Sequence, residues 1–315
     1  MHGFFVMGAA LFLGSSLLSA CSSSDNGSPS SAGSPTAGGG VTMSSGGVTT
    51  TSGGVVTGGG GAVSGSAGTS AVVGGTPSDG GGVAGGGGSA SLEPFSFFVT
   101  SLEAMHRLSA SEDGFGGDLR YGQADGLAGA DKICGDIAES SMPGSSAKQW
   151  RAFLSTTKVD AATRIGSGPW YDRVGRVVAM SLSDLLQDRP NGADAAIKND
   201  LPNESGTPNH KPDPSAAAAD NHHVLTGSTP QGKLYGATAT CLDWTSSLKD
   251  NAATGRPRVG FSWPASGRTN WISGQDEGGC GAGVAIVESG GLNLNNPIVG
   301  SGGGYGAIYC FALAP

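Results

Sequence analysis

The order of hydrophobic and polar positions divides this 315-residue chain into three parts. Residues 4–18 form an apolar run that is interrupted only by small residues. Residues 22–91 contain no aromatic residue and no sustained periodicity. Residues 92–315 alternate short hydrophobic segments with glycine-rich turns. Only this last part has the pattern of a folded domain.

The clearest periodicity of the third part predicts a helix over residues 126–139. Apolar side chains recur there at helical spacing, at Ala130, Ile133, Cys134 and Ile137. The other hydrophobic segments are shorter. A second short helix is predicted over 180–187, and strands over 95–100, 150–155, 224–227, 241–244, 284–287 and 307–312. Helices early and strands late predict an α+β domain over 92–315, with residues 188–221 as a long loop.

The first apolar run is too short to span a bilayer and is typical of a secretory signal. It ends in Leu18, Ser19, Ala20 and Cys21. This sequence resembles the lipobox of bacterial lipoproteins, in which cleavage leaves a lipidated cysteine as the first residue. The resemblance implies a signal peptide over 1–20 and lipid on Cys21, although the first residues lack Lys and Arg. The alternative is an ordinary cleaved signal peptide in which Cys21 has no role.

The second part has the composition of a tether. Residues 22–91 contain 24 glycines and only two charged residues, Asp25 and Asp79. Such a segment buries too little apolar surface to offset its conformational entropy. We therefore predict that residues 21–91 are a disordered linker rich in Gly, Ser and Thr, which holds the domain away from a membrane.

The net charge excludes one class of ligand, and the number of cysteines predicts disulfide bonds. The net charge of −8 argues against binding to nucleic acid or other polyanions. If Cys21 carries lipid, four of the five cysteines remain, namely Cys134, Cys241, Cys280 and Cys310. An even number in an exported protein predicts two disulfides, and spacing alone leaves three pairings open. A zinc site would need closely spaced ligand pairs such as C-x-x-C, which are absent.

Five segments in order resemble a known family, the bacterial endostatin-like outer-membrane lipoproteins. Residues 126–134 read G-L-A-G-A-D-K-I-C, similar to the family's G-L-x-G-A-D-x-x-C motif. Residues 241–247 read C-L-D-W-T-S-S, similar to its C-x-x-W-T-S-S segment. Further matches are 150–155, 225–227, in which Leu225 replaces the family's usual aromatic residue, and 309–311. The resemblance implies a C-type-lectin-like fold, with Cys134 paired to Cys310 and Cys241 paired to Cys280.

The resemblance also implies a surface binding module. Two departures limit it: this domain is acidic where endostatin has an Arg-rich heparin patch, and the calcium-dependent sugar motifs of lectins are absent. Motifs of catalysis are missing as well. We therefore expect a non-enzymatic protein without a cofactor, lipid-anchored in the cell envelope, in the outer membrane by analogy. An envelope spacer is the alternative, and an enzyme on the same fold is less favoured.

Several residues are candidates for binding. The loops between Thr226 and Ala307 are expected to contact an extracellular protein or polysaccharide, with Asn270 and Trp271 as ligand-binding residues and Trp271 as the exposed contact. Three weaker candidate binding sites are also compatible with a purely structural role of their residues. They are calcium at Asp113 and Asp118, sugar stacking on Trp170, Tyr171, Trp263 and Trp271, and metal at His222 and His223. Adjacent histidines on a strand should point to opposite faces, which disfavours the last.

Overall fold

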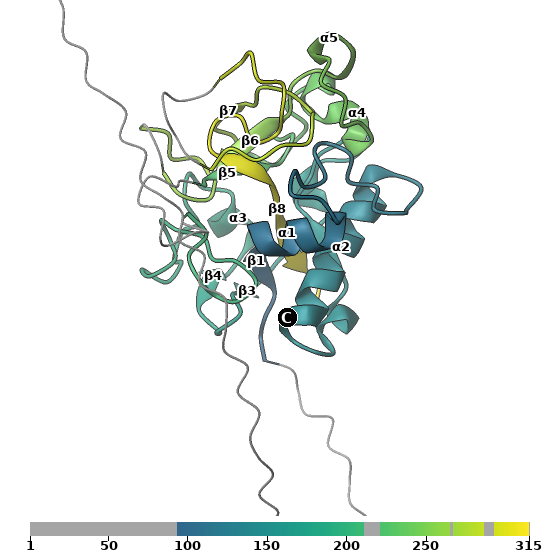
Figure 1. The fold of residues 1–315 in the computed structure, drawn as a ribbon. Coiled ribbons are helices and arrows are strands. Elements are labelled where there is room, and N and C mark those ends of the chain that lie inside the picture. The colour runs from purple at the N-terminus through teal and green to yellow at the C-terminus, as the bar shows by residue number, and fades with distance from the viewer. Residues whose placement is uncertain (1–92, 211–220, 265–266, 287–292, 315) are drawn as a thin grey trace, which may run out of the picture. The chain divides into compact units, whose positions relative to one another are not determined.

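The computed structural model describes residues 93–210, 221–264, 267–286 and 293–314 (Figure 1). The predicted signal peptide, Cys21 and the linker up to residue 91 lie outside these residues. The described part is a mixed α+β unit, as the pattern predicts. None of its helices combines the length and apolarity needed to cross a membrane.

The strand β8 (Gly304–Ala312) is the centre of the main sheet and is buried along its whole length. Two strands, β1 (Phe97–Val99) and β2 (Trp150–Ala152), pair antiparallel with its C-terminal half. Because both face Cys310 in register, they lie on opposite sides of β8. The first and last strands of the domain are therefore neighbours (Figure 1).

The other strands extend this sheet or stand apart from it. β5 (His223–Leu225) runs parallel to β8, and β6 (Arg258–Phe261) and β7 (Gln275–Asp276) follow antiparallel. A separate antiparallel pair consists of β3 (Trp170–Tyr171) and β4 (Val177–Ala179). The short helices are α3 (Leu182–Leu185), α4 (Cys241–Trp244) and α5 (Asn251–Thr254), with 3-10 turns η1 (Ser145–Lys148), η2 (Ala161–Thr163) and η3 (Ala237–Ala239).

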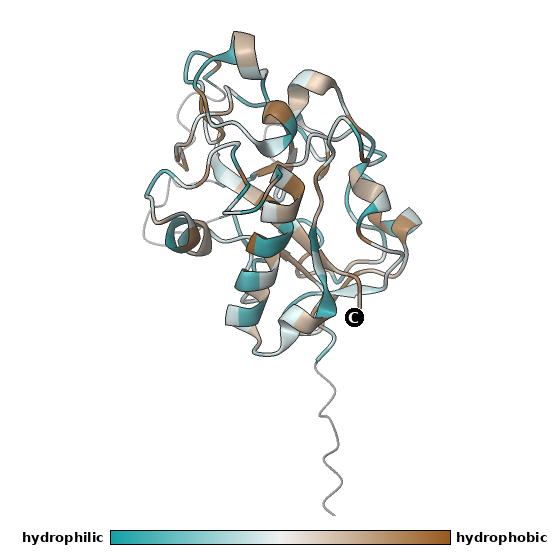
Figure 2. Ribbon diagram, turned by 90° about the vertical axis from the view of Figure 1, so that its right-hand side faces the viewer, coloured by the Kyte–Doolittle hydropathy of each residue, from teal (hydrophilic) through white to brown (hydrophobic). Residues whose placement is uncertain are grey.

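Two longer helices begin at side-chain caps. In α1 (Leu102–Ser109) the Oγ of Ser101 accepts from the amide of Ala104 at 3.1 Å. In α2 (Gly126–Ser141) the carboxylate of Asp125 accepts from the amide of Ala128 at 2.8 Å. Such caps satisfy amides that the first turn leaves without partners. Both helices mix hydrophilic and hydrophobic residues, as expected for elements with one buried face (Figure 2).

The predicted apolar face of α2 is confirmed. Its four side chains are fully buried, at Ala130, Ile133, Cys134 and Ile137. The helix contacts β2 and β8. Gly129 allows the close approach to the preceding loop, because a Cβ there would lie 2.0 Å from the carbonyl oxygen of Leu119.

Aromatic rings fill the core around β8. The ring of Phe311 lies 4.9 Å from Phe97, 5.9 Å from Phe153 and 5.5 Å from Trp170, measured between centroids. All four side chains are buried. Aromatic residues are only 6% of the sequence, yet they are concentrated where three strands meet. Burial of these large rings contributes hydrophobic stabilisation to the domain.

The two disulfides are those that the family resemblance implies. Cys134 of α2 pairs with Cys310 of β8, and Cys241 pairs with Cys280. The Cα separations of 5.5 and 5.6 Å are in the usual range. The first bridge links the longest helix to the last strand, and the second links α4 to the segment after β7.

Two of the predicted strands are wrong. Residues 241–244 form the helical turn α4, in which all four residues have positive φ between 49° and 65°. A left-handed turn of non-glycine residues is unfavourable, and tertiary contacts hold it. The indole Nε1 of Trp244 donates to the carbonyl of Ser155 at 2.8 Å, and Cys241 is in the second disulfide. In the described part of 284–287, only the isolated bridge between Ala285 and Gly304 forms.

Candidate functional site

Two cavities meet at Glu204, and we call them together the Glu204 cleft. Their volumes are about 620 and 660 Å³. Both are lined by Ser101, Glu103, Glu204 and Ser205. The first cavity also has α2 and the β3–β4 turn as walls, through Ile137, Ser140, Ser141, Arg173 and Val174. The volumes are in the range of natural ligand sites.

Glu204 is held by the ends of two helices. Its Oε2 accepts from the backbone amide of Ser101 at 3.0 Å, and its Oε1 accepts from the Ser101 hydroxyl at 2.5 Å. Its carbonyl accepts from the hydroxyl of Ser141, the last residue of α2. A carboxylate is favourable at the N-terminus of α1, where free amides and the helix dipole are positive. The side chain therefore fixes the loop around 204 against both helices.

Burial dominates the electrostatics of Glu204. Desolvation raises the pKa of its carboxyl group above the usual value, and the hydrogen bonds from Ser101 and the charge of Arg107 offset this only in part. Ionisation therefore costs free energy in the folded state. A carboxyl group with such a pKa in a cleft is a candidate functional group.

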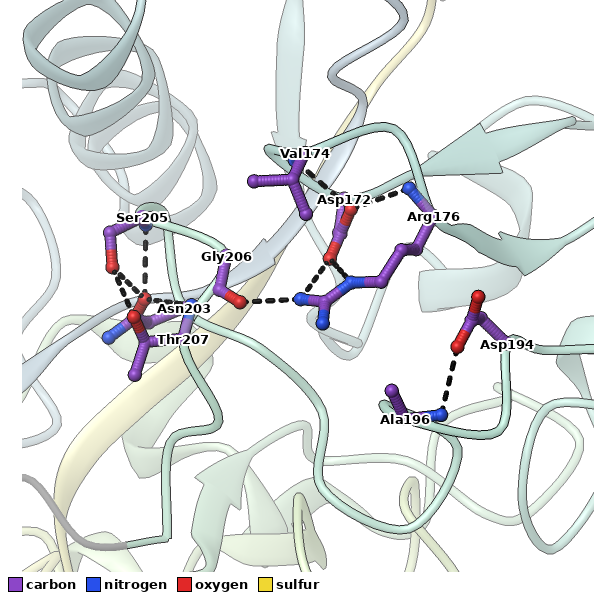
Figure 3. A network of polar contacts seen from close by, with 9 residues as sticks. All are labelled: Asp172, Val174, Arg176, Asp194, Ala196, Asn203, Ser205, Gly206 and Thr207. Atoms are coloured by element: carbon purple, nitrogen blue, oxygen red, sulfur yellow. Dashed lines mark hydrogen bonds and ion pairs between the residues drawn. The ribbon is translucent and has the colours of Figure 1, made fainter.

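A polar network makes one wall of the cleft rigid (Figure 3). Asp172 is fully buried and accepts from the amides of Val174 and Arg176 at 3.1 and 2.8 Å. Its other oxygen accepts from Nε of Arg176 at 2.7 Å, and the same guanidinium donates to the carbonyl of Gly206 at 2.5 Å. The β3–β4 turn thereby fixes the loop that carries Glu204 and Ser205.

The loop over residues 203–207 is also stabilised by hydrogen bonds among its own residues. The side-chain oxygen of Asn203 accepts from the amide and hydroxyl of Ser205 at 3.0 and 2.7 Å, and from the amide of Thr207 at 3.2 Å (Figure 3). An asparagine that bridges successive amides is typical of a rigid turn. Residues 203–207 therefore present Glu204 and Ser205 on a preformed surface.

Charges of both signs line the cleft. Glu103 and Arg107 of α1 are exposed, and the charged group of neither forms a hydrogen bond or a close ion pair with any described residue, although the charge of Arg107 acts on Glu204. Arg173 is oriented by Ser141, whose hydroxyl accepts from Nε at 3.2 Å, and by Glu93 at 3.2 Å. The cleft thus offers free donors and free acceptors, together with serine hydroxyls that can do both.

The residues predicted as binding contacts lie elsewhere. Trp271 is fully buried, its Nε1 donates to the carbonyl of Leu185 at 3.0 Å, and its ring packs on Phe153 and Tyr309. The prediction that Trp271 is exposed is therefore wrong, because the glycine-rich flanks return the chain to the core. Asn270 stabilises a turn by accepting from the amides of Ile272 and Ser273.

The weaker aromatic and acidic candidates do not form the sites considered. Of the aromatic residues, Trp170 is buried in the core, and Trp263 is half-buried and stacks on His210 at 5.2 Å. Both carboxylate oxygens of Asp118 accept from the guanidinium of Arg120, at 2.9 and 2.6 Å. This pair occupies the oxygens that a calcium ion would need.

The rings of His222 and His223 are not oriented as predicted for adjacent residues of a strand. His222 and His223 do not point to opposite faces, because their rings are perpendicular with centroids 4.4 Å apart. The strand begins only at His223 and has an irregular register there. The Nδ1 of buried His223 pairs with Glu277 at 2.5 Å. Across the described ranges, no group of three or more His, Cys, Asp or Glu is arranged to hold a metal ion.

Sequence reasoning missed the Glu204 cleft because its residues come from four distant segments. Ser101 follows the first strand, Arg107 lies on a helix that was not predicted, Arg173 lies in a turn, and Glu204 belongs to the long loop 188–221. The one available signal was that loop, whose length is unusual for a compact domain. Its described part, up to residue 210, forms a wall of the cleft.

Titration of Glu204 should be visible in the pH dependence of stability. Because its folded-state pKa is raised, the unfolded chain releases this proton first as pH increases. The free energy of unfolding contributed by Glu204 therefore falls as pH rises from about 4.5, the unperturbed value, through the folded-state pKa. We expect Glu204→Gln to gain stability relative to the native chain over this range, as measured by urea denaturation.

Glu139 provides a control of opposite sign. Its pKa is lowered, because its carboxylate accepts from the amides of Gly144 and Ser146. Its contribution is present above the usual carboxyl pKa and is lost as pH falls through the folded-state value. Glu139→Gln should therefore lose stability relative to the native chain near neutral pH. Identical profiles for the two variants would contradict the assignment of Glu204.

Comparison of the chain with models of known protein families and with curated proteins finds no match. The function of the cleft is therefore inferred from its own geometry.

Proposed function

We propose that this protein is a surface lipoprotein whose domain binds an extracellular ligand in the Glu204 cleft without changing it chemically. The observation that carries the proposal is the cleft itself. It is a preformed cavity with charged groups of both signs, Glu103 and Arg107, that form no close ion pair within the described residues, beside the Glu204 carboxyl group, whose pKa is raised by burial. Unpaired charged groups on a rigid concave surface are suited to recognition.

A segment of an extracellular protein fits the lining best. A peptide offers amide donors and carbonyl acceptors at regular intervals, and the serine hydroxyls of the cleft can pair with either. The guanidinium of Arg107 matches a carboxylate of the partner, and Glu103 matches a basic side chain. Because both acidic and basic groups line the cleft, binding need not depend on the net charge of the protein.

Binding is favoured over catalysis by the arrangement of Glu204. Both of its oxygens already accept hydrogen bonds from Ser101. A carboxylate used as base or nucleophile must instead direct a lone pair at the ligand. Both carboxylate oxygens thus serve mainly to fix the wall of the cleft. An envelope spacer without a ligand is the alternative function.

The proposal also includes a lipid anchor and membership of a fold family. We infer lipid on Cys21 from the residues before it, and a long linker over 22–91 from composition, which together would present the domain outward from the outer membrane. A C-type-lectin-like, endostatin-like fold is supported by the pairing of the first strand with the last and by the two disulfides. Both features agree with the family that the motifs resemble.

A protein array tests the function directly. We expect the mature chain to bind at least one extracellular matrix or host-surface protein, and Arg107→Ala to weaken that binding at least tenfold. The loss of one charge-assisted contact has about this effect. Arg268→Ala is the matched control, because Arg268 is also exposed but does not line the cleft. Affinities are measured by surface plasmon resonance at two salt concentrations.

Two results would count against the proposal. If no protein on the array binds, the envelope-spacer alternative is favoured. If a partner binds Arg107→Ala and Arg268→Ala with equal affinity, the domain recognises it through a surface other than the Glu204 cleft.

A further inference from the structure

A separate cavity lies in the connection between α1 and α2, and we call it the Tyr121 cavity. Its volume is about 550 Å³. It shares no lining residue with the Glu204 cleft. The lining consists of Ser109, Gly114, Phe115, Asp118, Arg120, Tyr121, Gly122, Gln123 and Ser247. Two aromatic rings and several planar polar side chains are thus gathered around one hollow.

The backbone at Tyr121 is unfavourable for a tyrosine. Tyr121 has a φ of 43° and Gly122 a φ of 76°, and the amide of Gln123 donates to the carbonyl of Arg120 at 2.7 Å. Positive φ at both central residues is the pattern of a type I′ turn, which prefers Asn, Asp or Gly. A bulky side chain in this region is a true outlier. Local backbone preference therefore does not explain why a tyrosine is here.

The ring of Tyr121 lies at the edge of the hydrophobic core and packs against it, but is only half-buried. It also contacts Phe115 and Lys132. The Phe115 ring, also half-buried, meets it edge to face at 5.6 Å, and the Lys132 ammonium lies 4.4 Å from its centroid. Residues held in strained backbone conformations are concentrated at functional sites.

Some polar side chains around the rings are paired with each other, and others have no hydrogen-bond partner among the described residues. Asp118 and Arg120 form a two-point ion pair, and the Arg120 hydrogen bonds lower the pKa of the Asp118 carboxyl group. These two charges neutralise each other. The side chains of Gln123 and Ser247 are exposed and form no hydrogen bond within the described part of the chain. They remain free to bind hydroxyl groups.

We propose that the Tyr121 cavity binds a pyranose ring of a neutral glycan. The apolar C–H face of a sugar packs on an aromatic ring, and its hydroxyl groups both donate and accept hydrogen bonds. Phe115 and Tyr121 supply the aromatic surface. Gln123 both donates to hydroxyl groups and accepts from them, and Arg120 donates to them through the guanidinium N–H groups that Asp118 does not take. The proposal does not depend on the Glu204 cleft, because the two sites share no residue.

The strain at Tyr121 gives a test that separates binding from folding. Asparagine tolerates positive φ, and this offsets the packing that the ring loses at the edge of the core, so Tyr121→Asn should change the melting temperature of the mature chain little. The same variant should weaken glycan binding at least tenfold. The probe is a printed array of neutral oligosaccharides of glucose, galactose, mannose and N-acetylglucosamine, followed by calorimetry on the strongest binder. Acidic oligosaccharides are printed on the same array.

Two further variants complete the experiment. Tyr235→Asn is the matched control, because Tyr235 is 47% exposed and also lies under a cation, the Arg258 guanidinium at 4.3 Å, but is outside the cavity. It should bind as the native chain does. Gln123→Ala changes only an exposed side chain and should weaken binding severalfold.

Several results would overturn the assignment. They are the absence of any neutral glycan binder, binding confined to acidic glycans, and unchanged affinity of Tyr121→Asn. A melting temperature that falls by several degrees in Tyr121→Asn would also do so, because the ring would then be needed for folding. Loss of protein binding in Arg107→Ala with intact glycan binding would show that the two sites act separately.

Discussion

Trp271→Ala is expected to lower the free energy of unfolding by about 3–5 kcal/mol, the usual cost of removing a buried large aromatic side chain. The indole is fully buried between Phe153 and Tyr309, at centroid distances of 5.4 and 4.9 Å. Its removal leaves a cavity and also leaves the carbonyl of Leu185 without its donor. Such a change is a large part of the 5–15 kcal/mol that stabilises an ordinary domain.

The measurement is urea denaturation followed by far-ultraviolet circular dichroism, since fluorescence would report the loss of the indole itself. Trp263→Ala is the matched control. That indole is half-buried and stacks on His210, so its removal should cost only about 1 kcal/mol, the typical effect of a point substitution. Equal effects of the two variants would contradict the central position of Trp271 in the core.

Long periodic segments could be predicted from the sequence, and short ones could not. The helix at 126–141 repeats its apolar face over four turns, so local pattern and tertiary packing agree. The segment 241–244 has only four residues, and its hydrophobic pattern is also compatible with a helical turn. A disulfide and the indole hydrogen bond of Trp244 decide its conformation. Neither contact can be read from four residues.

The strand β8 illustrates the same limit at a longer scale. Its apolar segment was predicted as 307–312, but the strand begins at Gly304. The glycines at 304 and 306 weaken the strand pattern in the sequence. Packing explains Gly304, because a Cβ there would lie 3.0 Å from the Cβ of His223, whereas Gly306 has a positive φ of 78°. Close approach to β5, and not local propensity, determines where this strand begins.

The candidate sites were harder to predict than the fold. The glycine-rich loops around Trp271 predict an exposed side chain, but glycine also permits a chain to re-enter the core. Tyr121, by contrast, stands in a turn whose sequence preference it violates, and this became visible only with the backbone angles. The cysteine pairs could be inferred from a family resemblance, since spacing left three pairings open.

Replacement of Cys134 and Cys310 together by alanine is expected to destabilise the domain more than replacement of Cys241 and Cys280. The two bridges close loops with sequence separations of 176 and 39 residues. In the chain-entropy model these closures contribute about 5 and 4 kcal/mol. Loss of the second bridge also lets the left-handed turn 241–244 relax, which offsets part of its cost. Thermal denaturation of both double variants, with the native chain as reference, measures the difference. A lower melting temperature for the Cys241 and Cys280 variant would contradict this order. It would mean that the second bridge contributes more than its loop length predicts.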